Sequence, residues 1–154
     1  MSQISLHTPV GDMTLFEADG AIVAVEWGWV PDQEESPVLT EARRQLEAYF
    51  QGDLTHFTIP LDHSGGTAFQ QRVWQAMQAI PYGETRSYGD LAEQLGSSPR
   101  AVGGACGKNP FPILIPCHRV VGRNGNLTGY TGSEGTDTKK RLLMLEGAAL
   151  FSPA

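Results

Sequence analysis

The residues best suited to covalent chemistry lie in the segment 115–122, IPCHRVVG, which holds the thiol of Cys117. A cysteine thiolate is a strong nucleophile, and nearby cationic groups favour that ionised form. His118 and Arg119 follow Cys117 directly, and the apolar run 113–115 precedes it. The chain turns from apolar to polar at Cys117, which favours a reactive thiol at the rim of a pocket.

Other interpretations of Cys117 stay open on the residues alone. Free cysteine is one of the most buried residue types, so Cys117 can equally be a filler of the core. A zinc site is less favoured, because no C-x-x-C spacing occurs and Cys106 lies eleven residues before Cys117. The position of His118 next to Cys117 does not by itself make it the base that takes the thiol proton. Side chains of adjacent residues point in different directions, so a water or another residue must complete a proton relay.

The first part of the chain has the pattern of a small strand-rich domain with one helix. Residues 4–8, 13–18 and 21–27 alternate roughly between apolar and polar side chains, and turn-forming residues separate them. Residues 38–51 carry an apolar stripe with helical spacing. A further strand is predicted for residues 57–61, FTIPL.

The second part is predicted to be mainly helical. An apolar stripe from Phe69 to Ile80 has the spacing of one helix face. Ser87 and Ser98 are suited to cap two short helices, and the segment 95–98 between them gives the pair the pattern of a helix-turn-helix. A last helix is predicted to begin near Asp137. Many helical hairpins share this pattern, so by itself it is only a weak indication of DNA binding.

Charge is distributed unevenly along the 154 residues, although the net charge is −6. Residues 1–66 hold two basic and eleven acidic side chains, whereas residues 67–154 hold nine basic and six acidic ones. No acidic residue lies between Glu93 and Glu134, the region that contains Cys117. We therefore predict a boundary near residue 66. The mild positive field around the cysteine is either chance clustering of charge or a sign of a nucleic-acid partner, and it is far weaker than in strongly basic nucleic-acid binders.

The composition also suggests where the protein works. Apolar residues make up 40% of the chain, which is enough for a packed core. No apolar stretch approaches the ~20 residues that cross a bilayer, and the N-terminal residues lack a signal-peptide pattern. We expect a cytoplasmic protein with reduced thiols and no contact with a membrane.

Four motifs occur in a characteristic order: SPRAVGGA at 98–105, GKNPFPILIPCHRVVG at 107–122, GYTG at 129–132 and LLMLEG at 142–147. In these motifs the chain resembles the O6-alkylguanine-DNA alkyltransferases, or methylated-DNA–protein-cysteine methyltransferases. The resemblance extends from about residue 69 to residue 147, while residues 1–66 match only in general character. It implies an α/β (α+β) fold, with a small strand-rich N-terminal domain over 1–66. A mainly helical domain with a winged-helix type of helix-turn-helix would follow over 67–154.

The resemblance implies direct-reversal DNA repair. Such a protein flips O6-alkylguanine, and O4-alkylthymine, out of duplex DNA and transfers the alkyl group irreversibly to its own cysteine, once per molecule. No metal and no cofactor is implied, and the partner is double-stranded DNA carrying alkylated guanine. The protein would act as a monomer, with cooperative binding along DNA left open. The alternative is a non-catalytic sensor of alkylated bases that recruits excision repair.

The resemblance also implies roles for the residues that match the motifs. Cys117 would be the alkyl acceptor, and His118 would take its proton through a water. Glu146 would orient His118, and Asn109 would tie the helix-turn-helix to the active-site turn. Tyr88 would contact the flipped nucleotide and help to protonate guanine N3.

Two further groups of residues follow from the same matches. Arg100 would enter the duplex where the base has left, together with a DNA-binding surface made by Tyr88, Ala101, Gly103, Gly104 and Arg123. The substrate pocket would be lined by Pro112, Val120, Tyr130, Thr131 and Gly132. The segment 133–136 makes this region longer than in many members of the family, and Cys106 is expected to be a small apolar neighbour and not a second acceptor.

Overall fold

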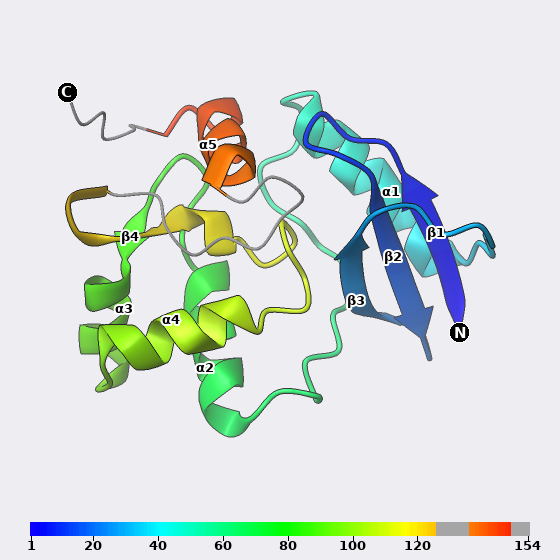
Figure 1. Cartoon of the computed structure of the whole chain (residues 1–154). Helices are drawn as coiled ribbons and strands as arrows, with labels where there is room; N and C mark the ends of the chain where they lie inside the picture. The colour runs from blue at the N-terminus through cyan, green and yellow to red at the C-terminus, as the bar shows by residue number, and fades with distance from the viewer. Residues whose placement is uncertain (126–135, 149–154) are drawn as a thin grey trace. The chain divides into compact units, whose positions relative to one another are not determined.

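A computed structural model of the chain describes residues 1–125 and 136–148. The chain forms two compact units, Met1–Gly65 and Gly66–Ala154. The described part of the first unit holds a three-stranded sheet and one helix, and that of the second holds most of the helices (Figure 1). The predicted mixed α+β fold class is confirmed.

The sheet of the first unit is an antiparallel meander. Strands β1 (Ser2–Leu6), β2 (Met13–Ala18) and β3 (Ala21–Trp27) pair in the order β1-β2-β3. Asp19 and Gly20 connect β2 to β3, and both have positive φ, at 53° and 82°. Two-residue turns of this kind match the twist of the strands that they join, and they favour an Asp-Gly sequence.

Helix α1 (Pro37–Phe50) packs against this sheet. Ser36 caps its start by accepting a hydrogen bond from the backbone N–H of Leu39 at 3.3 Å. The core between helix and sheet is made by fully buried apolar side chains, among them Ile4, Met13, Leu15, Ile22, Leu39, Leu46 and Tyr49.

The prediction of a strand over residues 57–61 is wrong. This segment forms only an isolated bridge to β3, between Ile22 and Leu61. Two backbone hydrogen bonds of 2.9 Å hold it, from Ile22 N–H to the Pro60 carbonyl and from Asp62 N–H to the Ile22 carbonyl. Pro60 has no N–H group, so it cannot donate to a longer ladder.

Three helices form the body of the second unit: α2 (Ala68–Gln78), α3 (Tyr88–Leu95) and α4 (Pro99–Gly107). Reciprocal hydrogen bonds between Ser87 and Asp90 cap α3, and Ser98 caps α4, as predicted. The turn between α3 and α4 needs a left-handed residue, which Gly96 supplies with φ 65°. The indole N–H of Trp74 donates to the Ala105 carbonyl at 2.9 Å and ties α2 to α4.

The remaining elements place the candidate site beside the helix-turn-helix. The short 3₁₀ helix η1 (Cys117–Arg119) leads into strand β5 (Val120–Val121), which pairs in parallel with β4 (Arg86–Ser87). A second 3₁₀ helix, η2 (Arg123–Gly125), follows, and α5 (Thr136–Leu145) contacts η1. Because β4 leads directly into α3, the pairing holds the start of α3 next to the strand that follows the cysteine.

Candidate active site

Cys117 begins η1 after a tight turn that Asn109 holds in place. The side-chain amide of Asn109 donates to the Ile115 carbonyl at 3.0 Å, and its oxygen accepts from the Phe111 N–H at 2.9 Å. Within the turn Ile113 has φ 72°, a left-handed conformation that is strained for a β-branched residue. Such strain persists only where surrounding contacts enforce it, and it is found most often at functional sites.

The thiol of Cys117 is held mainly in its protonated form. Burial raises its pKa, and the side-chain hydrogen bond with Asn109 and the positive charge of Lys139 oppose this rise. The residue as a whole is half-buried. A protonated thiol is a poor nucleophile, and attack therefore requires a group that accepts its proton.

His118 and Arg119, the two residues that follow Cys117, form a buried cluster with Glu146. The imidazole Nε2 of His118 lies 2.7 Å from one carboxylate oxygen of Glu146. Arg119 donates to both oxygens of the same carboxylate, through Nε at 2.8 Å and Nη2 at 3.0 Å. The three side chains expose almost no surface. Glu146 thus fixes His118 and Arg119 simultaneously, although it lies more than 25 residues away in sequence.

The hydrogen bond to Glu146 determines which nitrogen of His118 can act as a base. A carboxylate only accepts hydrogen bonds, so Nε2 carries the proton and Nδ1 keeps its lone pair. Among the described residues, Nδ1 of His118 is the one buried side-chain polar atom without a hydrogen-bond partner. Burial lowers the pKa of His118 despite the opposing effect of Glu146, so the imidazole is neutral at pH 7. The site therefore contains a neutral, oriented base with an open nitrogen.

Arg119 does not act on the thiol as its position in the sequence suggests. Its guanidinium binds Glu146, donates to the Ile80 carbonyl at 2.7 Å and lies 5.8 Å from the centre of the Tyr82 ring. The positive charge of Arg119 is therefore balanced by the negative charge of Glu146, which lies in the same buried space. Arg119 is therefore the counter-ion that keeps a carboxylate in the core.

Sequence reasoning missed Lys139, which lies on α5 close to the reactive groups. Its side chain has no exposed surface, and its Nζ lies 5.7 Å from the centre of the Tyr88 ring. Burial lowers its pKa to about 8, while the charges of Cys117 and Cys106 act in the opposite direction. One signal was available in the sequence. Lys139 precedes Glu146 by seven residues, or about two helical turns, so a helix through both would place them on one face, although α5 itself ends at Leu145.

Helix α4 presents an exposed face with few large side chains. Arg100, Ala101 and Gly104 are exposed on it, and Gly103 is partly exposed. A Cβ added at Gly104 would meet no other atom within 4 Å, so this position is open space. Of the residues that were predicted to bind DNA, these four lie together on α4. Tyr88 begins α3, and Arg123 is exposed on η2.

The second cysteine is enclosed in the core. Cys106 is buried on the inner face of α4, and its Sγ lies 3.2 Å from the sulfur of Met77. Burial raises its pKa to about 12. A thiol in this position remains protonated and has little access to a substrate.

The predicted substrate pocket is only partly within the described residues. Pro112 and Val120 are buried, Pro112 in the turn before the cysteine and Val120 in β5. Tyr130, Thr131, Gly132 and the segment 133–135 lie outside the described residues. The pocket roles of these residues therefore stay predictions.

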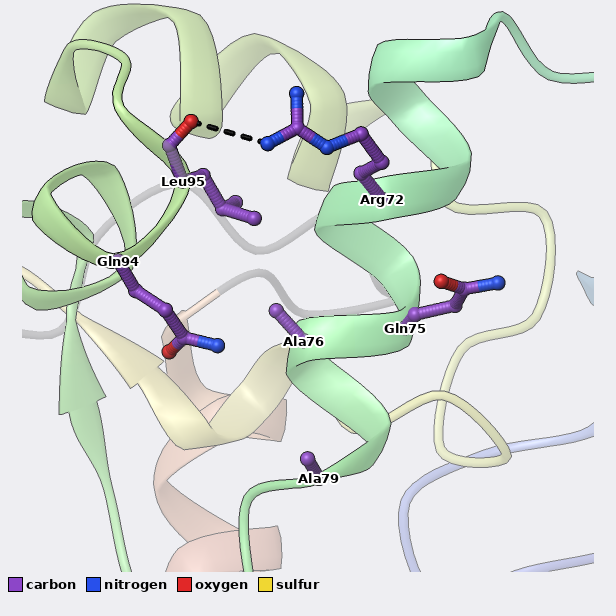
Figure 2. A pocket seen from close by; sticks show the side chains of 6 residues that line it. All are labelled: Arg72, Gln75, Ala76, Ala79, Gln94 and Leu95. Atoms are coloured by element: carbon purple, nitrogen blue, oxygen red, sulfur yellow. Dashed lines mark hydrogen bonds between the residues drawn. The ribbon is translucent and has the colours of Figure 1, made fainter.

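A separate groove lies between α2 and the end of α3. It has a volume of about 300 Å³, and it is lined by Arg72, Gln75, Ala76, Ala79, Gln94 and Leu95 (Figure 2). Arg72 crosses part of it by donating to the Leu95 carbonyl at 3.2 Å. None of the predicted site residues lines this groove.

Within residues 1–125 and 136–148, no group of three or more His, Cys, Asp or Glu side chains is arranged to hold a metal ion. Over the same described residues, no helix has both the length and the apolar character that a membrane crossing requires.

Comparisons with known proteins match both parts of the chain. The DNA-binding domain of 6-O-methylguanine DNA methyltransferase matches residues 68–148. The ribonuclease-like domain of 6-O-methylguanine DNA methyltransferase matches residues 1–63, where the sequence motifs had indicated only a general likeness. The methylated-DNA–protein-cysteine methyltransferase of Mycobacterium leprae is 55% identical over 92% of this chain and 90% of its own length. The constitutive enzyme of that name from Bacillus subtilis is 44% identical over 91% of this chain and 92% of its own length.

Solved structures of similar proteins share the fold. The crystal structure of Mycobacterium tuberculosis OGT in complex with DNA is 43% identical, with a TM-score of 0.85 over 96% of this chain and 93% of that chain. A second structure, of Mycobacterium tuberculosis O6-methylguanine methyltransferase, is 42% identical with a TM-score of 0.81, covering 95% of this chain and 92% of that one. The predicted resemblance is thereby confirmed over nearly the whole length of the sequence. The chain belongs to the 6-O-methylguanine DNA methyltransferase family.

Proposed function

We propose that this protein repairs duplex DNA by transferring the alkyl group of O6-alkylguanine, and of O4-alkylthymine, to Cys117. The observation that carries the proposal is a half-buried Cys117 followed directly in the chain by a neutral His118, whose Nδ1 has no hydrogen-bond partner and whose Nε2 is bound to Glu146. Relatives that bear the name methylated-DNA–protein-cysteine methyltransferase cover nearly the same length, which supports the same reaction.

The first step activates the thiol. The proton of Cys117 passes through one water molecule to Nδ1 of His118, and Glu146 stabilises the imidazolium that forms. Two features support this route. Burial raises the pKa of Cys117, so a base is needed, and the pKa of His118 is lowered, so the base is neutral and ready at pH 7.

The second step transfers the alkyl group. The Cys117 thiolate attacks the alkyl carbon, a carbon–sulfur bond forms, and the bond between that carbon and O6 breaks. The electron pair of the broken bond stays with the base, and a proton delivered to guanine N3 from Tyr88 neutralises it. The negative charge left on Tyr88 is balanced by the proton that His118 took from the thiol. The products are restored guanine and a thioether on Cys117. Because a thioether is not readily reversed, each molecule reacts once, and no cofactor enters this balance.

Access to the base requires that it leave the stack, since the alkyl carbon is hidden inside the duplex. We propose that the exposed face of α4 contacts the duplex and that Arg100 enters the gap that the flipped base leaves. The small side chains at Ala101, Gly103 and Gly104 support this assignment, because they allow close approach to a groove. They also leave few groups that can read base edges, so we expect little sequence preference in undamaged DNA.

We further propose that residues 67–154 carry the whole reaction and that residues 1–66 form a separate N-terminal domain. The reactive thiol, its base and the predicted DNA-binding residues all lie in the second part. We expect the protein to act as a monomer on DNA. Cytoplasmic localisation remains part of the same proposal.

The mass of the protein after incubation with duplex DNA containing O6-methylguanine tests the function. We expect one methyl group on the Cys117 peptide, an equal loss of O6-methylguanine from the DNA, and no further reaction with fresh substrate. The Cys117→Ser variant should bind the duplex and gain no mass. If folded, reduced wild-type protein binds the damaged duplex without gaining a methyl group, the transfer function is wrong and a sensor of alkylated bases remains.

The role of Arg100 predicts a difference between two substrates. The Arg100→Ala variant should transfer the alkyl group from duplex DNA roughly 10-fold more slowly, because base flipping contributes a few kcal/mol to the barrier. Its reaction with free O6-benzylguanine should be unchanged, because no stack has to be opened. The Lys108→Ala variant removes another exposed cation from the end of α4 and is the matched control. Equal losses on both substrates would contradict a role for Arg100 in base flipping.

A further inference from the structure

We propose that Tyr82 is a positioning residue of this site, whose ring and hydroxyl hold Glu146 where its carboxylate binds His118. The inference rests on the proposed function, because Glu146 acts there on the base that takes the thiol proton. Tyr82 acts through Glu146 and not on the alkyl group itself.

The position of Glu146 depends on contacts from outside α5, because this helix ends one residue earlier, at Leu145. The last four carbonyls of a helix have no partner within it and are satisfied in other ways. The two carbonyls that precede that of Leu145 accept from backbone N–H groups just past the helix, at 3.0 Å each. The Leu145 carbonyl accepts from the hydroxyl of Tyr82, at 3.3 Å. A side chain from another part of the unit thus completes the end of α5, directly before the carboxylate.

The ring of Tyr82 contacts the other partner of the buried ion pair. The guanidinium carbon of Arg119 lies 5.8 Å from the centre of this ring, within the range of a cation–π contact. Arg119 also donates to the Ile80 carbonyl at 2.7 Å, two residues before Tyr82. The turn of residues 80–83 therefore contacts both Arg119 and the chain next to Glu146.

Close packing in the same turn leaves Glu146 little room to shift. Gly83 has φ 82°, and a Cβ added there would lie 3.3 Å from the backbone oxygen of Glu146, which is tighter than ordinary van der Waals contact. Because Tyr82 directly precedes Gly83, the hydroxyl contact and this close approach fix the same short segment of chain.

The hydroxyl of Tyr82 keeps its proton at neutral pH and so remains a donor. Burial raises the pKa of Tyr82, the negative charge of Glu146 adds to this rise, and the positive charge of Arg119 opposes it. Removal of the hydroxyl would leave the Leu145 carbonyl without this donor. The distance of 2.7 Å between Glu146 and Nε2 of His118 would then no longer be held from this side.

Removing the hydroxyl alone, in Tyr82→Phe, should slow alkyl transfer to Cys117 by about 3- to 10-fold, because one hydrogen bond that holds Glu146 is lost. The loss should be equal for duplex DNA containing O6-methylguanine and for free O6-benzylguanine, since the base is affected and not the docking of DNA. Tyr82→Leu, which also removes the ring beside Arg119, should lose more. Tyr49→Phe removes a hydroxyl from the first unit and is the matched control. No loss in Tyr82→Phe, or a loss confined to duplex DNA, would overturn the proposal.

A double-mutant cycle separates the positioning of Glu146 from a general effect on the fold. If Tyr82 acts through Glu146, its hydroxyl has no further effect once the carboxylate is gone. The rate of Tyr82→Phe/Glu146→Gln should therefore equal that of Glu146→Gln within about a factor of two. A further loss as large as that of Tyr82→Phe alone would mean that the two residues act independently.

The hydrogen bond between His118 and Glu146 can also be followed by NMR, without DNA or alkyl transfer. In protein with isotopically labelled histidine, the Nε2–H resonance of His118 is identified by its shift in Glu146→Gln. We expect it to move in the same direction, by a smaller amount, in Tyr82→Phe and to stay in place in Tyr49→Phe. An unchanged resonance in Tyr82→Phe would contradict the positioning role. Failure of the repair function appears differently, as missing methyl transfer by the wild type while this shift persists.

Discussion

Replacing Glu146 with glutamine is expected to slow the transfer of the alkyl group to Cys117 by at least about 100-fold near pH 7. The carboxylate accepts a hydrogen bond from Nε2 of His118 at 2.7 Å and two from Arg119. Glutamine carries no negative charge, so it cannot stabilise the imidazolium that forms when Nδ1 of His118 takes the thiol proton. Arg119 donates to both carboxylate oxygens, so the amide NH₂ group meets an Arg119 N–H in either orientation of the amide. The base is therefore weakened even where the amide oxygen still accepts from Nε2.

The pH dependence of the Glu146→Gln variant separates this mechanism from simple damage to the fold. The defect should shrink as the pH rises toward the range in which Cys117 ionises without a base. The transfer rate is measured by the mass of the protein, with Glu47→Gln as a control that removes an exposed carboxylate of α1. A loss below 10-fold, or one that stays constant across the pH range, would show that Glu146 does not support protonation of His118.

Replacing Arg119 with methionine is expected to lower the free energy of unfolding of the second unit by about 3–5 kcal/mol. The guanidinium is 7% exposed and makes three charge-assisted hydrogen bonds, two to Glu146 and one to the Ile80 carbonyl. Methionine fills a similar volume but leaves the carboxylate without its counter-ion. Losing one partner of a buried pair is far more harmful than losing a pair on the surface.

Urea unfolding followed by the fluorescence of Trp74 measures this change. Trp74 is the tryptophan of the second unit, so Trp27 and Trp29 are replaced by phenylalanine in every variant compared. Arg141→Met, at an exposed position of α5, is the control and should change the free energy of unfolding by less than about 0.5 kcal/mol. The double variant Arg119→Met/Glu146→Leu should recover part of the loss, because it removes both charges. If the single variant is as stable as the control, the ion pair does not support the fold.

Features that depend on neighbours in sequence could be predicted from the sequence. The cap of α3 at Ser87, the cap of α4 at Ser98 and the left-handed Gly96 between them each follow from residues within one turn. The alternation of β1, β2 and β3 and the Asp-Gly turn are equally local. The prediction of a strand over residues 57–61 failed because strand formation also depends on a pairing partner. The composition of this segment suits a strand, but Pro60 limits its pairing to one bridge.

The electrostatics of the site could not be predicted in the same way. Cys117 and its immediate neighbours were evident as a reactive segment, but the direction of each side chain depends on packing between distant elements. Arg119 was expected to act on the thiol, and the structure places it on Glu146 instead. Lys139 carries no motif that marks it, and only the folded chain shows that its side chain is buried near the Tyr88 ring.

The exposed face of α4, which carries few large side chains, would affect how the protein searches DNA for damage. With one arginine and otherwise small side chains on that face, we expect encounters with undamaged DNA to be brief and equally long at every sequence. The time for which a base stays outside the stack, and not the strength of docking, would then decide whether an encounter ends in repair. On the proposed function, an alkylated guanine, which pairs less well, would remain outside longer and would react before the protein departs.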